Sequence, residues 1–410
     1  MTLKVLMVVH AWPPEQAGGT GLVVGNLATA LQAQGVEVTV AHPGPGGRSV
    51  WRGVAVEGVP VPRGLGWAAG WRHSTHAARE LLDRLQPDVV DIHHLSGWPL
   101  SLPLLARAQG ARVVMTLHDY SVVCARGQLV NRAGQVCPGP STQRCSRCLA
   151  PFLGVRARLM DAPSRRDRDA VADRLRLART VMEAADVRLA PSHDLARRYR
   201  RLGSGPVEHC PLPSSLRISP APPPGNGPVR FLFCSSLIPT KGPQQLVEAF
   251  ARLPEGRATL TVAGPCPPFP ADPGFGARLR RRIEATPDAA WLPPVPHSEV
   301  PQLLHAHDVL ALPSVWPENS PLIVREACAA GLRTIVSVQG GSGELDPLGR
   351  RVDMQGDGAG DRLYDALLAE SEIGRGRRPC VRWPTPASCA NWLTETVYTS
   401  GPTTIGLPTD

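Results

Sequence analysis

Two glutamates, Glu318 and Glu326, stand eight residues apart where a strand is expected to give way to a helix. The apolar run 309–312 predicts a buried strand, and residues 321–330 have helical spacing that Gly331 ends. A carboxylate on that helix can accept two hydroxyl groups of a sugar, and one in the preceding loop can do the same for a second sugar. The alternative for Glu326 is a solvated side chain paired with a neighbour.

The start of this helix is a second candidate for binding. We expect Asn319 or Ser320 to cap it and Pro321 to occupy its first turn. The backbone N–H groups near Leu322 and Ile323 would then have no acceptor within the helix. Such groups suit an anion or a hydroxyl, so we predict a polar ligand at this point of the chain.

Lysine is rare in this sequence, which contains only Lys4 and Lys241, and all other basic residues except histidine are arginine. Lys241 lies in the loop 235–242, directly after a strand predicted over 230–235. An ammonium group is a compact point charge that suits a phosphate. The alternative is a surface lysine at the start of a helix.

Histidines follow two of the predicted strands. His118 comes after the strand 113–117, and His93 and His94 come after the strand 89–92. In open α/β sheets, ligands bind beyond the carboxyl ends of the strands. This position favours a functional His118 over a purely structural one.

The sequence contains ten cysteines, and four of them cluster. Cys124, Cys137, Cys145 and Cys148 are spaced C-x12-C-x7-C-x2-C. Four thiolates with one close C-x2-C pair are typical of a structural zinc site. An iron–sulfur cluster is the second interpretation, and four free thiols are the third. We assign the cluster no catalytic role.

The elements that must position these residues form two runs of alternating strands and helices. The first run has strands at 4–10, 36–41, 89–92, 113–117 and 187–190, with helices at 22–32, 77–85, 100–109 and 170–185. The second has strands at 230–235, 259–263, 309–312 and 334–338, with helices at 244–252, 276–285, 300–306, 321–330 and 361–369. Such alternation predicts parallel sheets with helices on both faces.

A segment rich in proline and glycine, residues 212–229, separates the two runs and is the predicted linker. The predicted fold is therefore α/β, with two doubly wound, Rossmann-like domains facing across a cleft. We place the N-terminal domain at 1–211 with a cysteine-rich insertion at 120–150, and the C-terminal domain at 230–385. We predict that residues 386–410 form a helix or tail that crosses back to the first domain.

Composition limits the classes of function. The chain has 410 residues and a formal charge of +9, without the aromatic and basic clustering of a nucleic-acid binder. No apolar run approaches the ~20 residues of a membrane span, and the N-terminus has no secretory signal pattern. We expect a cytoplasmic enzyme with anionic ligands. The arginine-rich segment 156–179 is either a solvated helix face or a surface for the acceptor or for the inner face of a membrane.

The glutamate motif resembles a known family. Glu318-x7-Glu326, followed by Ala-x-Ala-Ala-Gly and by Gly340-Gly341-x-x-Glu344, is similar to the signature of the GT-B glycosyltransferases, in particular the retaining enzymes of family 4. The resemblance extends over about residues 3–345. It implies that Glu326 holds the ribose of the nucleotide and Glu318 contacts the transferred sugar. It also implies that the backbone over 320–323, after Asn319, contacts the donor.

Three other segments agree with this resemblance. Trp12-Pro13-Pro14-x-x-x-Gly18-Gly19 is similar to the family's first loop, whose glycines let the backbone approach the donor diphosphate. A dinucleotide fingerprint is the rival interpretation, weakened by the distance between strand and first glycine. Lys241 would neutralise the departing diphosphate, and His118 would lie near the donor sugar. Ser236 stands where the family usually has arginine, so one phosphate cation is missing.

The resemblance implies a retaining transfer from a nucleotide-diphosphate sugar to the hydroxyl of a glycan, a glycolipid or a natural product, without a catalytic metal. The predicted catalytic residues are His118, Lys241 and Glu318. Two alternatives remain at this stage. A phosphorylase that holds pyridoxal phosphate is nearly excluded by the scarcity of lysine, and a catalytically weakened nucleotide-sugar-binding protein would result if the Ser236 departure disables the site.

Overall fold

The computed structural model describes residues 2–12, 19–60, 69–150, 164–213, 216, 218–222, 225–269, 272–381 and 383–399, with side chains from residue 75 onward in the helix that begins at 69. These residues divide into two compact units. Unit 1 comprises Met1–Leu129, Cys137–Ser215 and Pro384–Asp410, and unit 2 comprises Val130–Val136 and Leu216–Trp383. Each unit has its own sheet.

The unit 1 sheet has the strand order β3-β4-β2-β1-β5-β6-β7-β8. Its strands are β1 Lys4–Val8, β2 Glu37–Pro43, β3 Gly47–Trp51, β4 Val54–Val59, β5 Val89–Ile92, β6 Arg112–Thr116, β7 Val187–Ala190 and β8 Glu208–His209. All pairings are parallel except that of β3 with β4. Because β1 is buried from Val5 to Val8, its sequence there is a continuous apolar run rather than an alternating one; β5 is buried along its whole length and carries one charged residue, Asp91.

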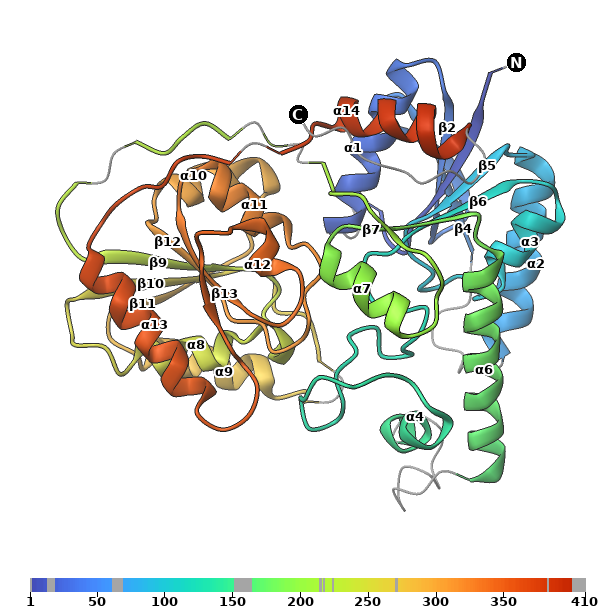
Figure 1. Cartoon of the computed structure of the whole chain (residues 1–410). Helices are drawn as coiled ribbons and strands as arrows, with labels where there is room; N and C mark the ends of the chain where they lie inside the picture. Colours follow the sequence, from blue (N-terminus) through green and yellow to red (C-terminus); the bar gives the residue numbers. More distant parts are fainter. Residues whose placement is uncertain are drawn as a thin grey trace. The chain divides into compact units, whose positions relative to one another are not determined.

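The described helices of unit 1 are shown in Figure 1, most of them against this sheet. They are α1 Gly19–Ala33, α2 Ala69–Leu85, α3 Leu102–Ala108, α4 Thr142–Leu149, α6 Arg165–Ala184, α7 His193–Arg201 and α14 Pro386–Trp392, which continues as the π-helix η4 Leu393–Tyr398. The chain thus returns to unit 1 after completing unit 2. There α14 packs on α1, and Arg112 Nε donates to the Val397 carbonyl at 2.7 Å.

The unit 2 sheet is parallel throughout its described strands, in the order β11-β10-β9-β12-β13-β14. The strands are β9 Val229–Cys234, β10 Ala258–Ala263, β11 Ala289–Leu292, β12 Val309–Leu312, β13 Arg333–Ser337 and β14 Arg350–Val352. The helices are α8 Pro243–Phe250, α9 Phe275–Glu284, α10 Val300–His305, α11 Leu322–Ala329, α12 Ser342–Leu345 and α13 Ala359–Ile373, with 3₁₀ turns η2 Pro239–Lys241 and η3 His297–Glu299. In Figure 1, α10 and α11 lie on one side of this sheet and α8, α9 and α13 on the other.

The predicted fold class is confirmed: both units are Rossmann-like α/β sheets. The expected strand 4–10 ends earlier, at Val8. The hairpin of β3 and β4 was not predicted, because β3 is a mostly exposed edge strand without an apolar run. Helix α7 was not predicted either, since its sequence is almost entirely polar. It forms behind a side-chain cap, in which the Leu195 N–H donates to Ser192 Oγ at 3.2 Å.

No helix in the described part of the chain combines the length and the apolar character that crossing a bilayer requires.

Candidate functional site

Glu318 is the centre of a buried polar cluster at the carboxyl edge of the unit 2 sheet. Its side chain lies in the loop after β12, and the residue is 3% exposed. Lys241 Nζ and Ser314 Oγ both donate to Glu318 Oε1, each at 2.6 Å. The Lys241 ammonium also lies 5.2 Å from the centroid of the Trp316 ring. Because both donors use Oε1, Oε2 of Glu318 has no protein donor among the described residues.

Two glycines allow the backbone to bring these side chains together. Gly340 has φ +90°, and a Cβ there would lie 2.1 Å from the Glu318 carbonyl oxygen. Gly242 has φ +77°, and a Cβ there would lie 2.1 Å from the Pro313 carbonyl oxygen. Any other residue would therefore push the Glu318 loop away from its neighbours, so the Lys-Gly and Gly-Gly pairs of the sequence are steric requirements of the site.

The start of α11 differs from the prediction. The N-cap residue is Pro321, and no side chain caps the helix, so the expectation that Asn319 or Ser320 does so was wrong. Both residues are buried in the loop before it. The Ser320 hydroxyl has no partner among the described residues, and neither the Leu322 nor the Ile323 N–H has an acceptor there. The start of α11 therefore offers the two predicted backbone donors and, in addition, the Ser320 hydroxyl.

Glu326 lies within the first two turns of α11 and is 5% exposed. His297 Nε2 lies 3.0 Å from Glu326 Oε1, and Oε2 has no donor in the described part of the chain. Burial raises the pKa of the Cys234 thiol to about 12, and the charge of nearby Glu326 adds to the rise. Glu326 therefore lies close to Cys234, the last residue of β9, which precedes Ser236 by two positions.

His297 was not identified from the sequence. It lies in η3, after the proline-rich turn that follows β11, and its side chain is 29% exposed. A histidine shortly after a strand end is the signal that singled out His118, and His297 lies five residues after the end of β11. The strand itself, β11, was missed because it is short and only partly buried.

The glycine loop of unit 1 lies mostly outside the described residues, and Gly18 is among those outside. Gly19 is the first residue of α1 and is exposed. Ser236 is half-buried in the loop after β9, where its carbonyl accepts from the Ile238 N–H at 3.0 Å. The roles predicted for these three residues stay predictions.

His118 lies in a cluster of imidazoles at the carboxyl edge of the unit 1 sheet. His93 Nδ1 and His118 Nε2 are 2.9 Å apart, and His94 Nε2 is 3.0 Å from Asp119 Oδ2. Burial, helped by the neighbouring His93, holds the pKa of His118 well below 6.5. Burial likewise lowers the pKa of His10 to about 4. His118 and His10 are therefore neutral at physiological pH.

The four clustered cysteines lie in the segment between β6 and α6. Cys145 and Cys148 are one turn apart in α4, and no described cysteine forms a disulfide. Burial raises the pKa of the Cys145 thiol, and the thiols of Cys124, Cys137 and Cys148 raise it further, so the four lie near one another. Over the described residues, however, no group of three or more possible ligands is arranged to hold a metal ion.

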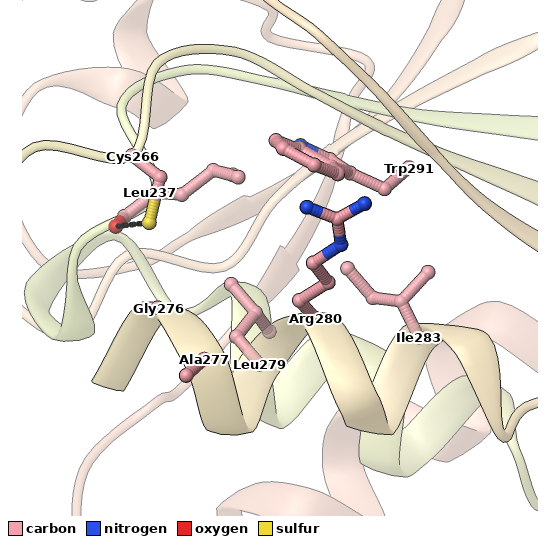
Figure 2. A pocket seen from close by; sticks show the side chains of 8 residues that line it. All are labelled: Leu237, Cys266, Gly276, Ala277, Leu279, Arg280, Ile283 and Trp291. Carbon is pink, nitrogen blue, oxygen red and sulfur yellow. Dashed lines mark hydrogen bonds between the residues drawn. The ribbon is translucent and has the colours of Figure 1, made fainter. Parts of the chain in front are cut away.

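A separate cavity of about 380 Å³ lies between α9 and the strand ends of unit 2 (Figure 2). Its walls are mostly apolar, and the Arg280 guanidinium stacks on the Trp291 ring at 4.6 Å. The lining residues are Leu237, Cys266, Gly276, Ala277, Leu279, Arg280, Ile283 and Trp291. None of the predicted donor contacts lines it.

The chain matches two family models that together span residues 18–345. Residues 18–214 match a glycosyl transferase 4-like domain, and residues 217–345 match the glycosyl transferases group 1. A D-inositol 3-phosphate glycosyltransferase from Pseudarthrobacter chlorophenolicus is 27% identical over 407 residues, which cover 90% of this chain and 89% of that protein. One from Mycobacterium ulcerans is 30% identical over 109 residues, 27% of this chain and 23% of that protein.

Solved structures share the fold. The sucrose-phosphate synthase from Thermosynechococcus elongatus aligns with a TM-score of 0.67 at 16% identity, over 97% of this chain and 95% of that one. The Anabaena protein HepE, solved in complex with UDP and glucose, aligns with a TM-score of 0.62 at 13% identity, over 97% of this chain and all of that one.

Proposed function

We propose that unit 2 binds a nucleotide-sugar donor through Lys241, Glu318 and Glu326. The premise is that the chain belongs to the retaining family 4 glycosyltransferases and transfers a sugar from such a donor. The observation that carries the proposal is the unused Oε2 atom of each glutamate. Both carboxylates are buried, held by a protein donor on Oε1 and free on Oε2. A buried carboxylate with one fixed and one available oxygen is suited to accept a sugar hydroxyl.

Lys241 and Glu318 hold each other in place before the donor arrives. Their ion pair and the Trp316 ring fix the ammonium at the strand edge. When the diphosphate binds, the ammonium gains a second anionic partner, and charge developing on the leaving phosphate strengthens that contact. The stabilisation is therefore larger in the transition state than in the ground state, which is the requirement for faster turnover.

The start of α11 completes the proposed donor site. The Leu322 and Ile323 N–H groups and the Ser320 hydroxyl offer donors to the diphosphate or the sugar. Glu326, one turn later, accepts the two ribose hydroxyls, and His297 orients its carboxylate. Ser236 supplies a neutral donor where the family usually has arginine. This chain then relies more heavily on Lys241 than a relative with two cations would.

The proposed reaction keeps the anomeric configuration by displacement on one face of the sugar. The acceptor hydroxyl attacks the anomeric carbon as the bond to the diphosphate breaks, and the leaving phosphate takes the hydroxyl proton. Unit 1 is proposed to bind the acceptor, with neutral His118 hydrogen-bonded to a sugar hydroxyl. The protein then acts by positioning and by charge stabilisation, and we expect no need for a catalytic metal ion.

A ligand screen followed by a transfer assay tests this function. Nucleotide diphosphates and their sugars, beginning with UDP-glucose, are compared for their effect on the melting temperature, since a ligand of the folded state raises it. Hydrolysis or transfer of the stabilising donor is then measured with glycan, lipid-linked and natural-product acceptors, and with inositol phosphate because of the relative's name. Donor binding without hydrolysis or transfer would favour the alternative of a weakened sugar-nucleotide-binding protein.

We also propose a structural zinc ion on Cys124, Cys137, Cys145 and Cys148. The proximity of the four thiols supports it. Binding would require Cys137 to leave the Gly139 carbonyl, to which it now donates at 3.4 Å, and Cys148 to leave Arg126. Elemental analysis of protein purified without chelators should find about one zinc per chain, reduced by Cys145→Ser but not by Cys266→Ser. Visible absorbance would indicate an iron–sulfur cluster instead. If the purified protein contains neither zinc nor iron, both interpretations are wrong.

The acceptor surface is proposed to include α6, on the basis of its excess of arginine. A capping box of Ser164 and Asp167 starts this helix, and Arg174 is used internally, donating to the Ser121 and Val122 carbonyls. The excess positive charge of the helix would attract a lipid-linked acceptor or the anionic inner face of the membrane. Sedimentation with anionic vesicles, compared with neutral ones, tests this contact.

A further inference from the structure

The loop 313–320, which carries Glu318, is held in place at Val315. The Val315 N–H donates to the Thr240 carbonyl at 2.9 Å, and the Val315 carbonyl accepts from Gln355 Nε2 at 2.8 Å. Gln355 follows β14 and is half-buried. Both backbone polar groups of Val315 are therefore satisfied within unit 2, which gives the loop one defined position at this point.

The residues on either side of Val315 make contacts of the proposed donor site. Ser314 Oγ donates to Glu318 Oε1, and the Trp316 ring lies 5.2 Å from the Lys241 ammonium. A shift of the backbone at Val315 would move both neighbours, because they share its peptide groups. The hydrogen bond at its carbonyl therefore affects the position of the Lys241–Glu318 ion pair.

The amide of Gln355 has one defined orientation. Its Oε1 accepts from the Val136 backbone N–H at 3.1 Å, and its Nε2 donates to the Val315 carbonyl. Turning the amide over would set an NH₂ group against an N–H and an oxygen against a carbonyl. The backbone of Gln355 is fixed as well: its N–H donates to Asp353 Oδ1 at 2.9 Å, and its carbonyl accepts from Arg362 Nη2 at 2.7 Å. Gln355 is thus held at both ends of its side chain.

Val136 belongs to a short hairpin in the segment between β6 and α6. Val130 and Val136 form an antiparallel bridge, and the Cys137 N–H donates to the Leu129 carbonyl at 2.7 Å. The Val136 N–H donates out of the hairpin, to the glutamine amide. The hairpin 130–136 belongs to unit 2, whereas Leu129 and Cys137 belong to unit 1. A stretch of the N-terminal half of the chain therefore completes the support of a loop in unit 2.

We infer that Gln355 is a positioning residue of the donor site, and that the hairpin 130–136 fixes its amide so that Nε2 holds the Val315 carbonyl. This place requires a side chain with both an acceptor and a donor, and glutamate offers only acceptors. The influence of Gln355 on transfer passes through the Lys241–Glu318 pair and rests on the function proposed above. The contacts themselves do not depend on that function.

Hydrogen exchange of the full chain, measured by mass spectrometry, tests the contacts without any ligand. In Gln355→Glu, the segment 313–320 should exchange about five- to tenfold faster, the factor for loss of one hydrogen bond. The buried strand β9 should exchange as in the wild type, which excludes a global change in stability. Gln34→Ala, which removes an amide-to-carbonyl contact in unit 1, is the matched control. Unchanged exchange of 313–320 in Gln355→Glu would overturn the inference.

Val136→Pro tests the part of the hairpin. Proline has no N–H, so the oxygen of the Gln355 amide loses its donor while its NH₂ group stays intact. Exchange of the segment 313–320 should rise, by a smaller factor than in Gln355→Glu. Exchange equal to that of the wild type would overturn the role given to the hairpin.

Turnover of UDP-glucose separates positioning from stability. At a temperature where the variant is folded, Gln355→Glu should lower kcat about tenfold. In a Lys241→Ala background it should lower kcat less than twofold, because a residue that acts through another loses its effect when that residue is absent. Equal losses in both backgrounds would contradict a role through Lys241. If the wild type turns over no UDP-glucose, that result bears on the proposed function, and the exchange measurement still decides the positioning role.

Discussion

The two edges of the unit 2 sheet both place buried carboxylates beside cations, but they satisfy them differently. At the amino edge, Asp308 is fully buried and uses both oxygens: Arg230 Nη2 donates to Oδ1 at 2.9 Å, and Arg230 Nε donates to Oδ2 at 3.0 Å. The Arg230 backbone N–H and Arg375 Nε also donate to Oδ2, at 3.0 and 3.2 Å, and the Arg377 guanidinium lies 3.8 Å from Oδ1. Both oxygens of this carboxylate are therefore occupied by protein donors.

At the carboxyl edge, Glu318 and Glu326 each use one oxygen. One ammonium and one hydroxyl share Oε1 of Glu318, and one imidazole contacts Oε1 of Glu326. The comparison teaches that burial and a charged neighbour do not by themselves identify a functional carboxylate. A saturated carboxylate fixes the fold, whereas one with an available oxygen can exchange contacts with a ligand. Four substitutions and a pH comparison can break or sharpen this distinction.

The largest effect is expected for Lys241→Ala. It removes the only described cation at Glu318, and kcat should fall about 10²- to 10³-fold, as when one charge-stabilising donor is lost from other active sites. Lys4→Ala is the matched control, because Lys4 is the only other lysine and lies in unit 1. Steady-state kinetics measure both. Full activity in Lys241→Ala would mean that Glu318, like Asp308 at the amino edge, serves the fold and not a ligand.

Asp308→Ala should act on stability and not on kinetics. It leaves the guanidinium groups of Arg230, Arg375 and Arg377 without their shared partner, and the free energy of unfolding should fall by about 3 kcal/mol. Urea unfolding measures this loss, and kcat at a temperature where the variant is folded should be unchanged. Asp361→Asn, which alters an exposed ion pair with Arg252, should cost well under 1 kcal/mol. Comparable losses in the two variants would argue against a saturated structural network.

Glu326→Gln should weaken donor binding about tenfold. The amide keeps the shape of the side chain but loses the charge and one acceptor, so it cannot accept two ribose hydroxyls equally. Calorimetry with the nucleotide diphosphate measures Kd, and the exposed Glu372→Gln serves as control. His297→Gln should weaken binding by a smaller factor, since it removes only the group that orients Glu326. Unchanged affinity in Glu326→Gln would remove this residue from the donor site.

The smallest expected effect is a pH dependence at the amino edge. Burial holds the pKa of His307, beside Asp308, below 6.5. The folded state thus binds fewer protons than the unfolded state, so the contribution of neutral His307 to stability is complete above pH 6.5 and is lost as the pH falls below it. Urea unfolding at pH 7 and pH 5.5 should show a smaller loss on acidification in His307→Gln than in the wild type. Equal losses would assign the acid sensitivity to other groups.

Much of the fold could be predicted from the sequence, for a physical reason. Strands such as β5 and β7 are mostly buried and mostly apolar, with one charged residue each, Asp91 and Arg188, and each lies between turns or helices that local chemistry marks clearly. The predicted bounds of both are those observed. Two edge strands were missed for different reasons: β3 is mostly exposed and has no apolar run, and β11 is apolar but short and only partly buried.

The candidate site could be predicted only in part. The Glu318-x7-Glu326 spacing and the rare Lys241 selected two residues that form an ion pair, Lys241 and Glu318, and a third, Glu326, in the same unit. The cap of α11 was predicted wrongly, since the side chains of Asn319 and Ser320 are held in a buried loop instead of turning back to the helix. The spacing of a motif gives no information on which oxygen of a carboxylate a neighbour will occupy.

The sequence by itself therefore determined the fold class, the family and the residue types of the site, because these depend on hydrophobic periodicity and on local motifs. Only the tertiary structure decided which of those residues share a partner. His297 reaches Glu326 across 29 positions and Tyr398 reaches Asp91 across 307. Such contacts arise when the sheet aligns strand ends that are far apart in the chain, and no local pattern in the sequence records that alignment.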